Sequence, residues 1–315
     1  MGLSDGGCTK LDELGPDTYA YLHSDSGWGH SNAGVVRAGD AVLLIDTQYT
    51  LPMTRQLITA IDDAGLPPVT TVVNTHANGD HAWGNQLFPS ADIVASVATA
   101  QSMPHDFPPA LMQRLLSSDA ATTAAGRYTQ LHFGAFDFDG VLVTTPTTTF
   151  TGTMCLDIGG REVVLREVGP AHSDGDVIIH VPDADVCFAG DILFAADHPV
   201  MWCGPLENWI AACDSILETG ATHIVPGHGP VVGPDGVRYF RAYLQHVADG
   251  LALRFSQGMP YWEAAMDLPL GPYRHLALRE RLVATAAATY HHLGAPKVPP
   301  AEVLERMAQA HFNAA

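Results

Sequence analysis

Six side chains of metal-binding type occur in four short segments that are rich in glycine, proline or asparagine. They are His76, Asp80 and His81 in THANGDH, His172 in GPAHSDGD, Asp191 in FAGDILF and His228 in VPGHGP. Imidazole and carboxylate are ligands that zinc prefers, and a hydrolytic zinc keeps one coordination position open for water. Glycine, proline and asparagine let a backbone bend sharply, so these segments could turn toward a common centre. The residues therefore predict a metal site that activates water.

Each segment alone also has an ordinary structural explanation. Asn78-Gly79 is a hairpin-turn signal, Asp191 could cap a turn, and His228 could be an exposed loop residue. The joint occurrence of the four segments beside apolar strands favours the metal site, because functional side chains are commonly carried on loops at strand ends. Other histidines have no second ligand near them in the sequence, and we expect them on the surface or in the core: His23, His30, His105, His180, His246, His275, His291 and His292.

The composition excludes several classes of function. The chain has 315 residues, of which 47% are hydrophobic, and its net charge is −19. A surface this acidic repels phosphate backbones, so we expect no nucleic-acid partner. No apolar run approaches the roughly 18 residues that span a bilayer, so we expect no membrane association. The first residues lack a signal-peptide pattern, and the five cysteines are scattered without a CxxC pair. We therefore expect reduced thiols and a cytoplasmic location.

Apolar patterning predicts alternating strands and helices that would hold the four segments. We expect strands at 33–47, around a turn at Gly39-Asp40, and at 69–75, 138–168, 176–191 and 221–226, with helices at 50–65, 110–126 and 207–220. From Val237 onward only helices are expected. The best of them, 278–294, would stack Leu278, Leu282, Ala286 and Tyr290 at four-residue intervals. We predict one α/β fold, with a catalytic domain at 1–235 and a helical C-terminal extension at 236–315 packed on it.

The order of these motifs resembles the metallo-β-lactamase superfamily, from SNAGVVRAGDAVLLIDT to VPGHGP. The resemblance implies an αββα sandwich with one or two zinc ions at one edge, between two sheets. It implies that His76, residue 78 and His172 hold one ion. Asp80, His81 and His228 would hold the other, and Asp191 would bridge the two. Asp46, in LLIDT, matches an aspartate that supports these ligands. Asn78 departs from the family pattern, which has histidine there, and its amide oxygen would be a weak ligand.

The implied metal determines the implied chemistry. Zinc lowers the pKa of a water ligand from about 15.7 to about 7, and it polarises a substrate carbonyl. Asp80, beside both metal positions, could orient the water and carry its proton, which makes it the candidate catalytic residue. The reaction class is hydrolytic cleavage of an acyl bond.

Aromatic residues near the metal segments predict a flat, apolar substrate. The candidate pocket residues are Trp28, Tyr49, Trp83, His198 and Trp202. NTHANGDHAWGNQLF together with MWCGPLENWIAACD also resembles the cyclase/thioesterases of bacterial aromatic polyketide biosynthesis. That resemblance implies a thioesterase/cyclase acting on a polyketide thioester carried by an acyl carrier protein. Two alternatives remain open: a general cytosolic ester, lactone or thioester hydrolase, and a non-catalytic module that binds metal or a carrier protein.

Overall fold

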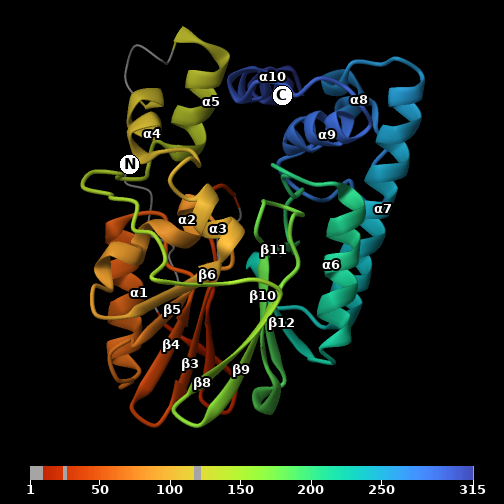
Figure 1. Cartoon of the computed structure of the whole chain (residues 1–315). Helices are drawn as coiled ribbons and strands as arrows, with labels where there is room; N and C mark the ends of the chain where they lie inside the picture. Colours follow the sequence, from red (N-terminus) through yellow and green to blue (C-terminus); the bar gives the residue numbers. More distant parts are fainter. Residues whose placement is uncertain (1–9, 24–26, 117–121, 315) are drawn as a thin grey trace.

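Two β-sheets lie face to face, and helices cover the outer side of each (Figure 1). The structure is a computed structural model that describes residues 10–23, 27–116 and 122–314. Within these residues the larger sheet has the order β1 (Asp12–Gly15), β2 (Thr18–Tyr21), β3 (Ala33–Ala38), β4 (Ala41–Ile45), β5 (Thr71–Val73), β6 (Asp92–Ser96) and β7 (Thr148–Phe150). The smaller sheet has the order β12 (His223–His228), β11 (Val186–Phe194), β10 (Val177–Val181), β9 (Arg161–Glu167) and β8 (Thr153–Ile158).

The α-helices are numbered in chain order. They are α1 (Leu51–Asp63), α2 (Gly79–Ala82), α3 (Val97–Ser102), α4 (Pro109–Leu115), α5 (Ala124–Phe133), α6 (Leu206–Glu218), α7 (Pro234–Ser256), α8 (Tyr261–Asp267), α9 (Arg281–His292) and α10 (Pro300–Ala314). Short 3₁₀ turns lie at Trp83–Leu87, Pro182–Ala184 and Gly271–Tyr273. The predicted α/β sandwich with a helical C-terminal region is confirmed.

Branched apolar residues fill the space between the two sheets. Val36, Ile45 and Val73 of the larger sheet share one buried cluster with Leu165 and Ile179 of the smaller sheet. Such side chains pack well on pleated surfaces, and burying each contributes about 1.5–3 kcal/mol. This packing fixes the distance between the sheets and thus between the loops at their common edge.

The outer layer of the larger sheet contains α1. The Thr50 side chain accepts a hydrogen bond from the Met53 amide at 3.3 Å, as expected of an N-cap. Leu57 and Ile61 are buried in a cluster with Val72 of the sheet. The predicted helix at 50–65 is therefore confirmed to within two residues.

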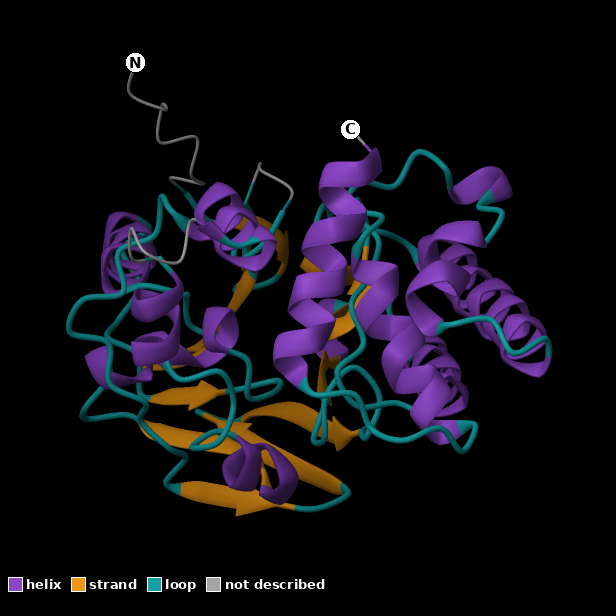
Figure 2. Cartoon of the chain, turned by 90° about the horizontal axis from the view of Figure 1, so that it is seen from above, coloured by secondary structure: helices purple, strands orange, loops and turns teal. Residues whose placement is uncertain are grey.

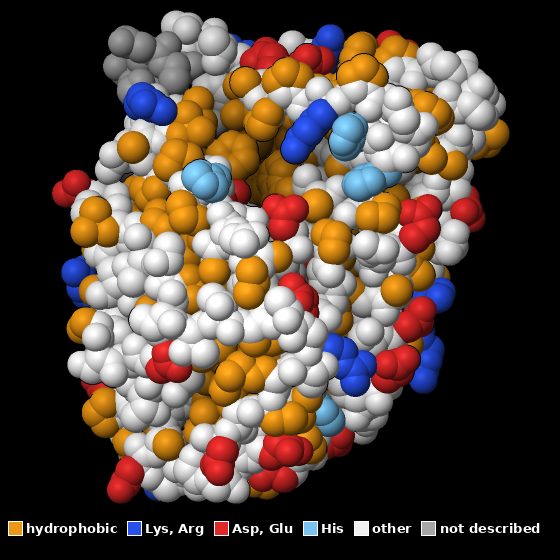
Figure 3. All heavy atoms as spheres, viewed as in Figure 1, with side chains coloured by type: hydrophobic (Ala, Val, Ile, Leu, Met, Phe, Trp, Pro, Cys, Tyr) orange, Lys and Arg blue, Asp and Glu red, His pale blue; other side chains and the backbone are white. Residues whose placement is uncertain are grey.

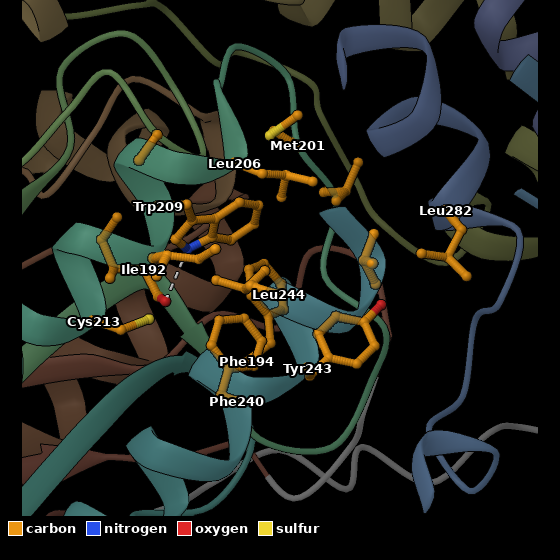
Figure 4. Packing of buried hydrophobic residues seen from close by; sticks show 14 of the residues in the cluster. Ile192, Phe194, Met201, Leu206, Trp209, Cys213, Phe240, Tyr243, Leu244 and Leu282 are labelled. Atoms are coloured by element: carbon orange, nitrogen blue, oxygen red, sulfur yellow. Dashed lines mark hydrogen bonds between the residues drawn. The ribbon is translucent and has the colours of Figure 1, made fainter. Parts of the chain in front are cut away.

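The outer layer of the smaller sheet contains α6 and α7, which lie side by side (Figure 1). Trp209 of α6 is fully buried, and its Nε1 donates to the carbonyl of Ile192 at 3.0 Å (Figure 4). Phe240 and Leu244 of α7 belong to the same cluster. The segment after residue 236 thus begins within a layer of the sandwich, and the division of the chain at residue 235 stays a prediction.

Three expected elements differ in the structure. Residues 138–147 form no strand, because Phe138 and Val141 pack against an aromatic cluster and Gln86 Nε2 donates to the Gly140 carbonyl at 3.1 Å. The helical pattern at 110–126 is divided between α4 and α5, and residues 117–121 lie outside the described residues. Leu278 precedes α9 with a φ of 58°, so the stack of apolar residues begins at Leu282.

Helices from distant parts of the chain meet above the edge of the sandwich (Figures 1 and 2). We call α5, α9 and α10 the helical roof; α10 packs against both α5 and α9. Within the described residues, no helix is both long and apolar enough to cross a membrane.

Candidate metal centre

The six predicted ligands lie together at the edge of the sandwich that the helical roof covers. His76 follows β5, Asp80 and His81 lie on α2, His172 lies between β9 and β10, Asp191 lies in β11, and His228 ends β12. Their ligand atoms form two groups, each with all atoms within 4.8 Å of one another: His76, His172 and Asp191, and Asp80, His81 and His228. Segments separated by up to 152 residues thus meet because the strands that carry them end at one edge.

Asp191 lies between the two groups. Its Oδ1 is 3.1 Å from His81 Nε2 and 3.4 Å from His228 Nε2. Its Oδ2 is 3.4 Å from His172 Nε2 and 3.9 Å from His76 Nε2. Each carboxylate oxygen therefore faces one group, which is the arrangement that a bridging ligand requires.

Hydrogen bonds behind the histidines direct their Nε2 atoms to the centre. Asp46 Oδ2 accepts from His81 Nδ1 at 2.8 Å, and Asp46 also accepts from the amide and hydroxyl of Thr75, each at 2.7 Å. The Nδ1 atoms of His172 and His228 contact the carbonyls of Val200 and His30 at 2.7 and 3.1 Å. A carbonyl accepts only from a protonated Nδ1, so Nε2 keeps its lone pair for a metal.

The donor set fits divalent metal ions. Within the described residues, His76 Nε2, His81 Nε2 and Asp191 Oδ1 are buried without a hydrogen-bond partner. Unpaired buried polar atoms cost about 1–3 kcal/mol each. His76 Nε2 belongs to one ligand group and His81 Nε2 to the other, so metal ions at the two positions, with Asp191 between them, would satisfy these atoms.

The electrostatics of the centre also favour a bound cation. Burial and the charge of neighbouring His81 hold the pKa of His76 well below its ordinary value. Burial opposes ionisation of Asp191, but the imidazoles of His228, His81 and His172 outweigh it and hold the Asp191 pKa well below its ordinary value. His76 is therefore a neutral imidazole and Asp191 an ionised carboxylate, the forms that bind metal. Burial lowers the pKa of His81, but Asp191, Asp46 and Asp80 outweigh it and raise that pKa well above its ordinary value, so a metal ion that binds His81 must displace a proton.

Asn78 points into the first group. Its Oδ1 is 2.8 Å from His172 Nε2, and its Nδ2 donates to Asp106 Oδ2 at 2.9 Å. The bond to Asp106 fixes which end of the amide faces His172. The His172 Nδ1 proton is engaged with Val200, so the amide oxygen and the Nε2 lone pair face the same point. Asp106 thus orients Asn78, and no sequence motif singled it out.

The centre opens into an apolar cavity of about 490 Å³, which appears in Figure 3 as a hollow lined by hydrophobic side chains. Trp28, Tyr49, Trp83 and Trp202 line it, as do apolar residues of the helical roof. His198 lies outside the lining, with its buried Nδ1 2.8 Å from the Tyr243 hydroxyl. The sequence reasoning missed the contribution of α5, α9 and α10, because their apolar residues look like ordinary core positions.

A third group of potential ligands lies within the helical roof. It consists of His132, Glu280 and His311. Glu280 Oε1 already accepts from the Tyr128 hydroxyl at 3.0 Å and faces His311 Nδ1 at 3.2 Å. We assign this group to holding α5, α9 and α10 together.

Comparisons with known proteins agree with this geometry. Residues 26–228 match the family model of the metallo-beta-lactamase superfamily. The acyl-coenzyme A thioesterase MBLAC2 of Homo sapiens is 21% identical over 233 residues, covering 69% of this chain and 79% of that protein, and the Bos taurus protein matches equally. A metallo-beta-lactamase from Pontibacter korlensis superposes with a TM-score of 0.58 at 18% identity, covering 75% of this chain and 98% of that one. A variant of the sec-alkyl sulfatase PisA1 superposes with a TM-score of 0.68 at 17% identity, covering 94% of this chain and 52% of that one. At these identities the two structures show a shared fold alone.

Proposed function

Since the chain belongs to the metallo-β-lactamase superfamily, whose members are generally hydrolases, we propose that it is a zinc-dependent thioesterase. The observation that carries this proposal is the pair of ligand groups around Asp191, which opens directly into the apolar cavity. The thioester is the favoured acyl bond because the similar human and bovine proteins are named acyl-coenzyme A thioesterases.

The ligand groups and Asp80 would have different roles in the reaction. Zinc ions held by the two groups would acidify water and polarise the thioester carbonyl. Asp80 lines the cavity, and its Oδ2 is 3.4 Å from His228 Nε2. From there Asp80 can orient the attacking water and accept its proton. A C–O bond forms, the C–S bond breaks, and the proton leaves with the thiolate as a thiol.

The cavity wall supports a flat, apolar acyl group. The rings of Trp28 and Trp202 lie 6.2 Å apart at 36°, and Tyr49 stacks on Trp83 at 5.0 Å. Aromatic walls of this kind suit a planar, partly cyclised substrate. We therefore propose an aromatic polyketide intermediate, with ring closure as an accompanying activity. A general ester, lactone or thioester hydrolase is the alternative that the same cavity supports.

The mouth of the cavity supports delivery on a phosphorylated carrier. Lys297, His291 and His292 line the cavity, and Figure 3 shows basic and histidine side chains on its rim. Lys297 is one of two lysines in a chain of net charge −19. A cation kept at this mouth would attract the phosphate of a phosphopantetheine arm on an acyl carrier protein.

A thioester assay tests the proposal. The zinc-loaded protein is mixed with a phenylacetyl or benzoyl thioester of N-acetylcysteamine, and the released thiol is measured. Asp191→Asn, which keeps the shape but removes the bridging charge, should lose at least a hundredfold in rate. Asp63→Asn, at an exposed aspartate that ends α1 outside the cavity lining, is the matched control. Metal binding without any thiol release would instead support a non-catalytic module.

A further inference from the structure

A buried arginine lines the cavity above the metal centre. Arg281 is the first residue of α9, and its side chain is 1% exposed. Among the described residues that line the cavity, Arg281 and Lys297 are the two lysine or arginine side chains, and Lys297 lies in the connection between α9 and α10. Burying a guanidinium is costly unless its charge and its donors are satisfied.

The protein leaves this guanidinium poorly satisfied. Within the described residues, the hydrogen bond found for Arg281 runs from Nη1 to the His198 carbonyl at 3.2 Å. Its Nε is buried without a partner. The nearest carboxylate is that of Asp197, whose Oδ2 is 3.9 Å from Nη1 and accepts from the Gly27 amide at 2.8 Å. Within the described residues Asp197 Oδ1 is also buried without a hydrogen-bond partner, so the two side chains make no direct hydrogen bond.

The other buried arginines behave differently. Arg161 and Arg254, each 9% exposed, use all three nitrogens in hydrogen bonds. Their closest carboxylate contacts are 2.9 Å, to Asp183, and 2.8 Å, to Asp267. Arg281 is thus the most buried of the three and the least paired, which is unexpected of an arginine whose role is to stabilise the fold.

Aromatic rings hold the Arg281 guanidinium in place. Its Cζ lies 4.2 Å from the centre of the Trp28 ring. Trp28 Nε1 donates to the Tyr128 hydroxyl at 2.9 Å, which in turn donates to Glu280. A guanidinium stacked on a ring in this way keeps its edge, and therefore its N–H groups, free for a ligand.

The ring of Phe194 lies between the Arg281 guanidinium and the candidate metal ligand His228. Phe194 lies 5.9 Å from Arg281 Cζ, and its ring stacks on His228 at 5.1 Å and 12°. Phe194 also lines the cavity. An acyl chain whose carbonyl lies at the metal centre could therefore cross Phe194 and reach Arg281 within a few carbon atoms.

We propose that Arg281 binds an anionic oxygen on the acyl part of the substrate, a carboxylate or an enolate, while the thioester carbonyl lies at the metal centre. This inference rests on the proposed function and narrows its substrate class to acyl groups that carry a second oxygen. An enolised β-diketone has such an oxygen, and a simple fatty acyl chain does not. Arg281 is then a specificity residue: it favours acyl chains that carry a second oxygen over unsubstituted hydrocarbon chains.

Binding of product-like acids tests the role of Arg281 without turnover. The probes are dicarboxylates of four to eight carbons, such as glutarate, each compared with the monocarboxylate of equal length, such as pentanoate. Calorimetric titration of the zinc-loaded protein gives both dissociation constants. One carboxylate of either probe can bind at the metals. The ratio of the monocarboxylate dissociation constant to the dicarboxylate dissociation constant therefore measures what the second carboxylate adds to binding. A charge-assisted hydrogen bond predicts that at least one dicarboxylate binds about tenfold more tightly, or better, than its partner.

Three variants complete the test. Arg281→Met, which keeps the length and removes the charge, should bring the ratio close to one. Arg281→Lys should keep a smaller preference, because lysine has the charge without the planar fork. Arg254→Met removes a buried arginine outside the cavity lining, and it should keep the wild-type ratio.

Two outcomes would overturn the inference. One is a wild-type ratio near one for every chain length, and the other is an unchanged ratio in folded Arg281→Met, which would place the second carboxylate away from Arg281, at the metals or at Lys297. If Arg281→Met does not fold, a ratio in Arg281→Lys equal to that of the wild type overturns it equally. Failure of the thioester assay alone would count against the proposed function and leave this binding result standing.

Discussion

Asp46→Asn should weaken the metal position that contains His81 more than the position that contains His76. Asp46 is 2% exposed, and its Oδ2 accepts from His81 Nδ1 at 2.8 Å and from the Thr75 hydroxyl at 2.7 Å. In asparagine, Oδ1 can still accept from the Thr75 amide, but an NH₂ group replaces Oδ2 and faces the His81 Nδ1 proton. His81 relieves this clash by moving its proton to Nε2, which removes the lone pair that binds metal.

The magnitude follows from the contacts that change. Loss of a partner that orients a ligand lowers metal affinity by about 10–100-fold. The variant also replaces two charge-assisted hydrogen bonds of a buried carboxylate with neutral ones, at a cost of about 1–1.5 kcal/mol each, so the free energy of unfolding should fall by about 2–3 kcal/mol. The affected position is the one formed by Asp80, His81 and His228, which has its full set of charged and imidazole ligands and should bind zinc more tightly.

Chelator competition measures this effect. Zinc is titrated against a chromophoric chelator in wild type and Asp46→Asn, and urea unfolding of each metal-free protein gives the stability change separately. Asp92→Asn is the control, because the exposed Asp92 carboxylate also binds threonine hydroxyls but lies far from the centre. The reasoning is refuted if the tighter zinc-binding step of folded Asp46→Asn keeps its wild-type affinity.

Three further predictions concern the centre and its surroundings. Asn78→His should raise the affinity of the weaker zinc-binding step by about tenfold or more, because imidazole replaces an amide oxygen; an unchanged titration would show that residue 78 is not a ligand. His172→Ala should abolish thioester hydrolysis while circular dichroism stays native, because the change removes a ligand from a loop; wild-type rates in the folded variant would rule out a metal-dependent reaction at this site. Burial, with the charges of nearby arginines, lowers the pKa of His198 to about 4. The unfolded chain, with a histidine pKa of about 6.5, then takes up a proton that the native state does not, so stability falls with decreasing pH between about 6.5 and 4. Between pH 7 and pH 5, the free energy of unfolding should therefore fall by about 2 kcal/mol less in His198→Gln than in wild type. Urea unfolding at each pH measures it, and an equal fall in both proteins would contradict the prediction.

The clustering of the six candidate ligands could be predicted from the sequence because most of them stand beside a recognisable strand. His76 follows a run of β-branched residues, and His228 follows a short apolar strand that ends in Pro-Gly. Their strands, β5 and β12, belong to different sheets, and the two residues meet because the packed sheets end at one common edge of the sandwich. The position of Asp191 between two groups required the fold, because it depends on the spacing of two packed sheets.

The cavity could not be predicted in the same way. The sequence places Arg281 in a predicted apolar helix, and its burial depends on Trp28, which lies about 250 residues earlier in the chain. Asp106 lies in PHDF, a segment without a recognisable motif, and it becomes meaningful only through its bond to Asn78. His198 shares a segment of the sequence with Trp202, but its side chain faces Tyr243 of α7. Contacts between separate layers of the fold determine the surroundings of these three side chains. The local sequence pattern therefore does not predict them.

Zinc titration of thioesterase activity tests the central claim most directly. The protein is freed of metal by a chelator, and thiol release is followed while zinc is added in fractions of an equivalent. We predict no turnover without metal, and a rise in rate that ends between one and two zinc ions per chain, with the last part of the rise at the weaker position that contains Asn78. Thiol release that persists in the metal-free protein, or that never appears when both positions are saturated, would contradict a zinc-dependent thioesterase.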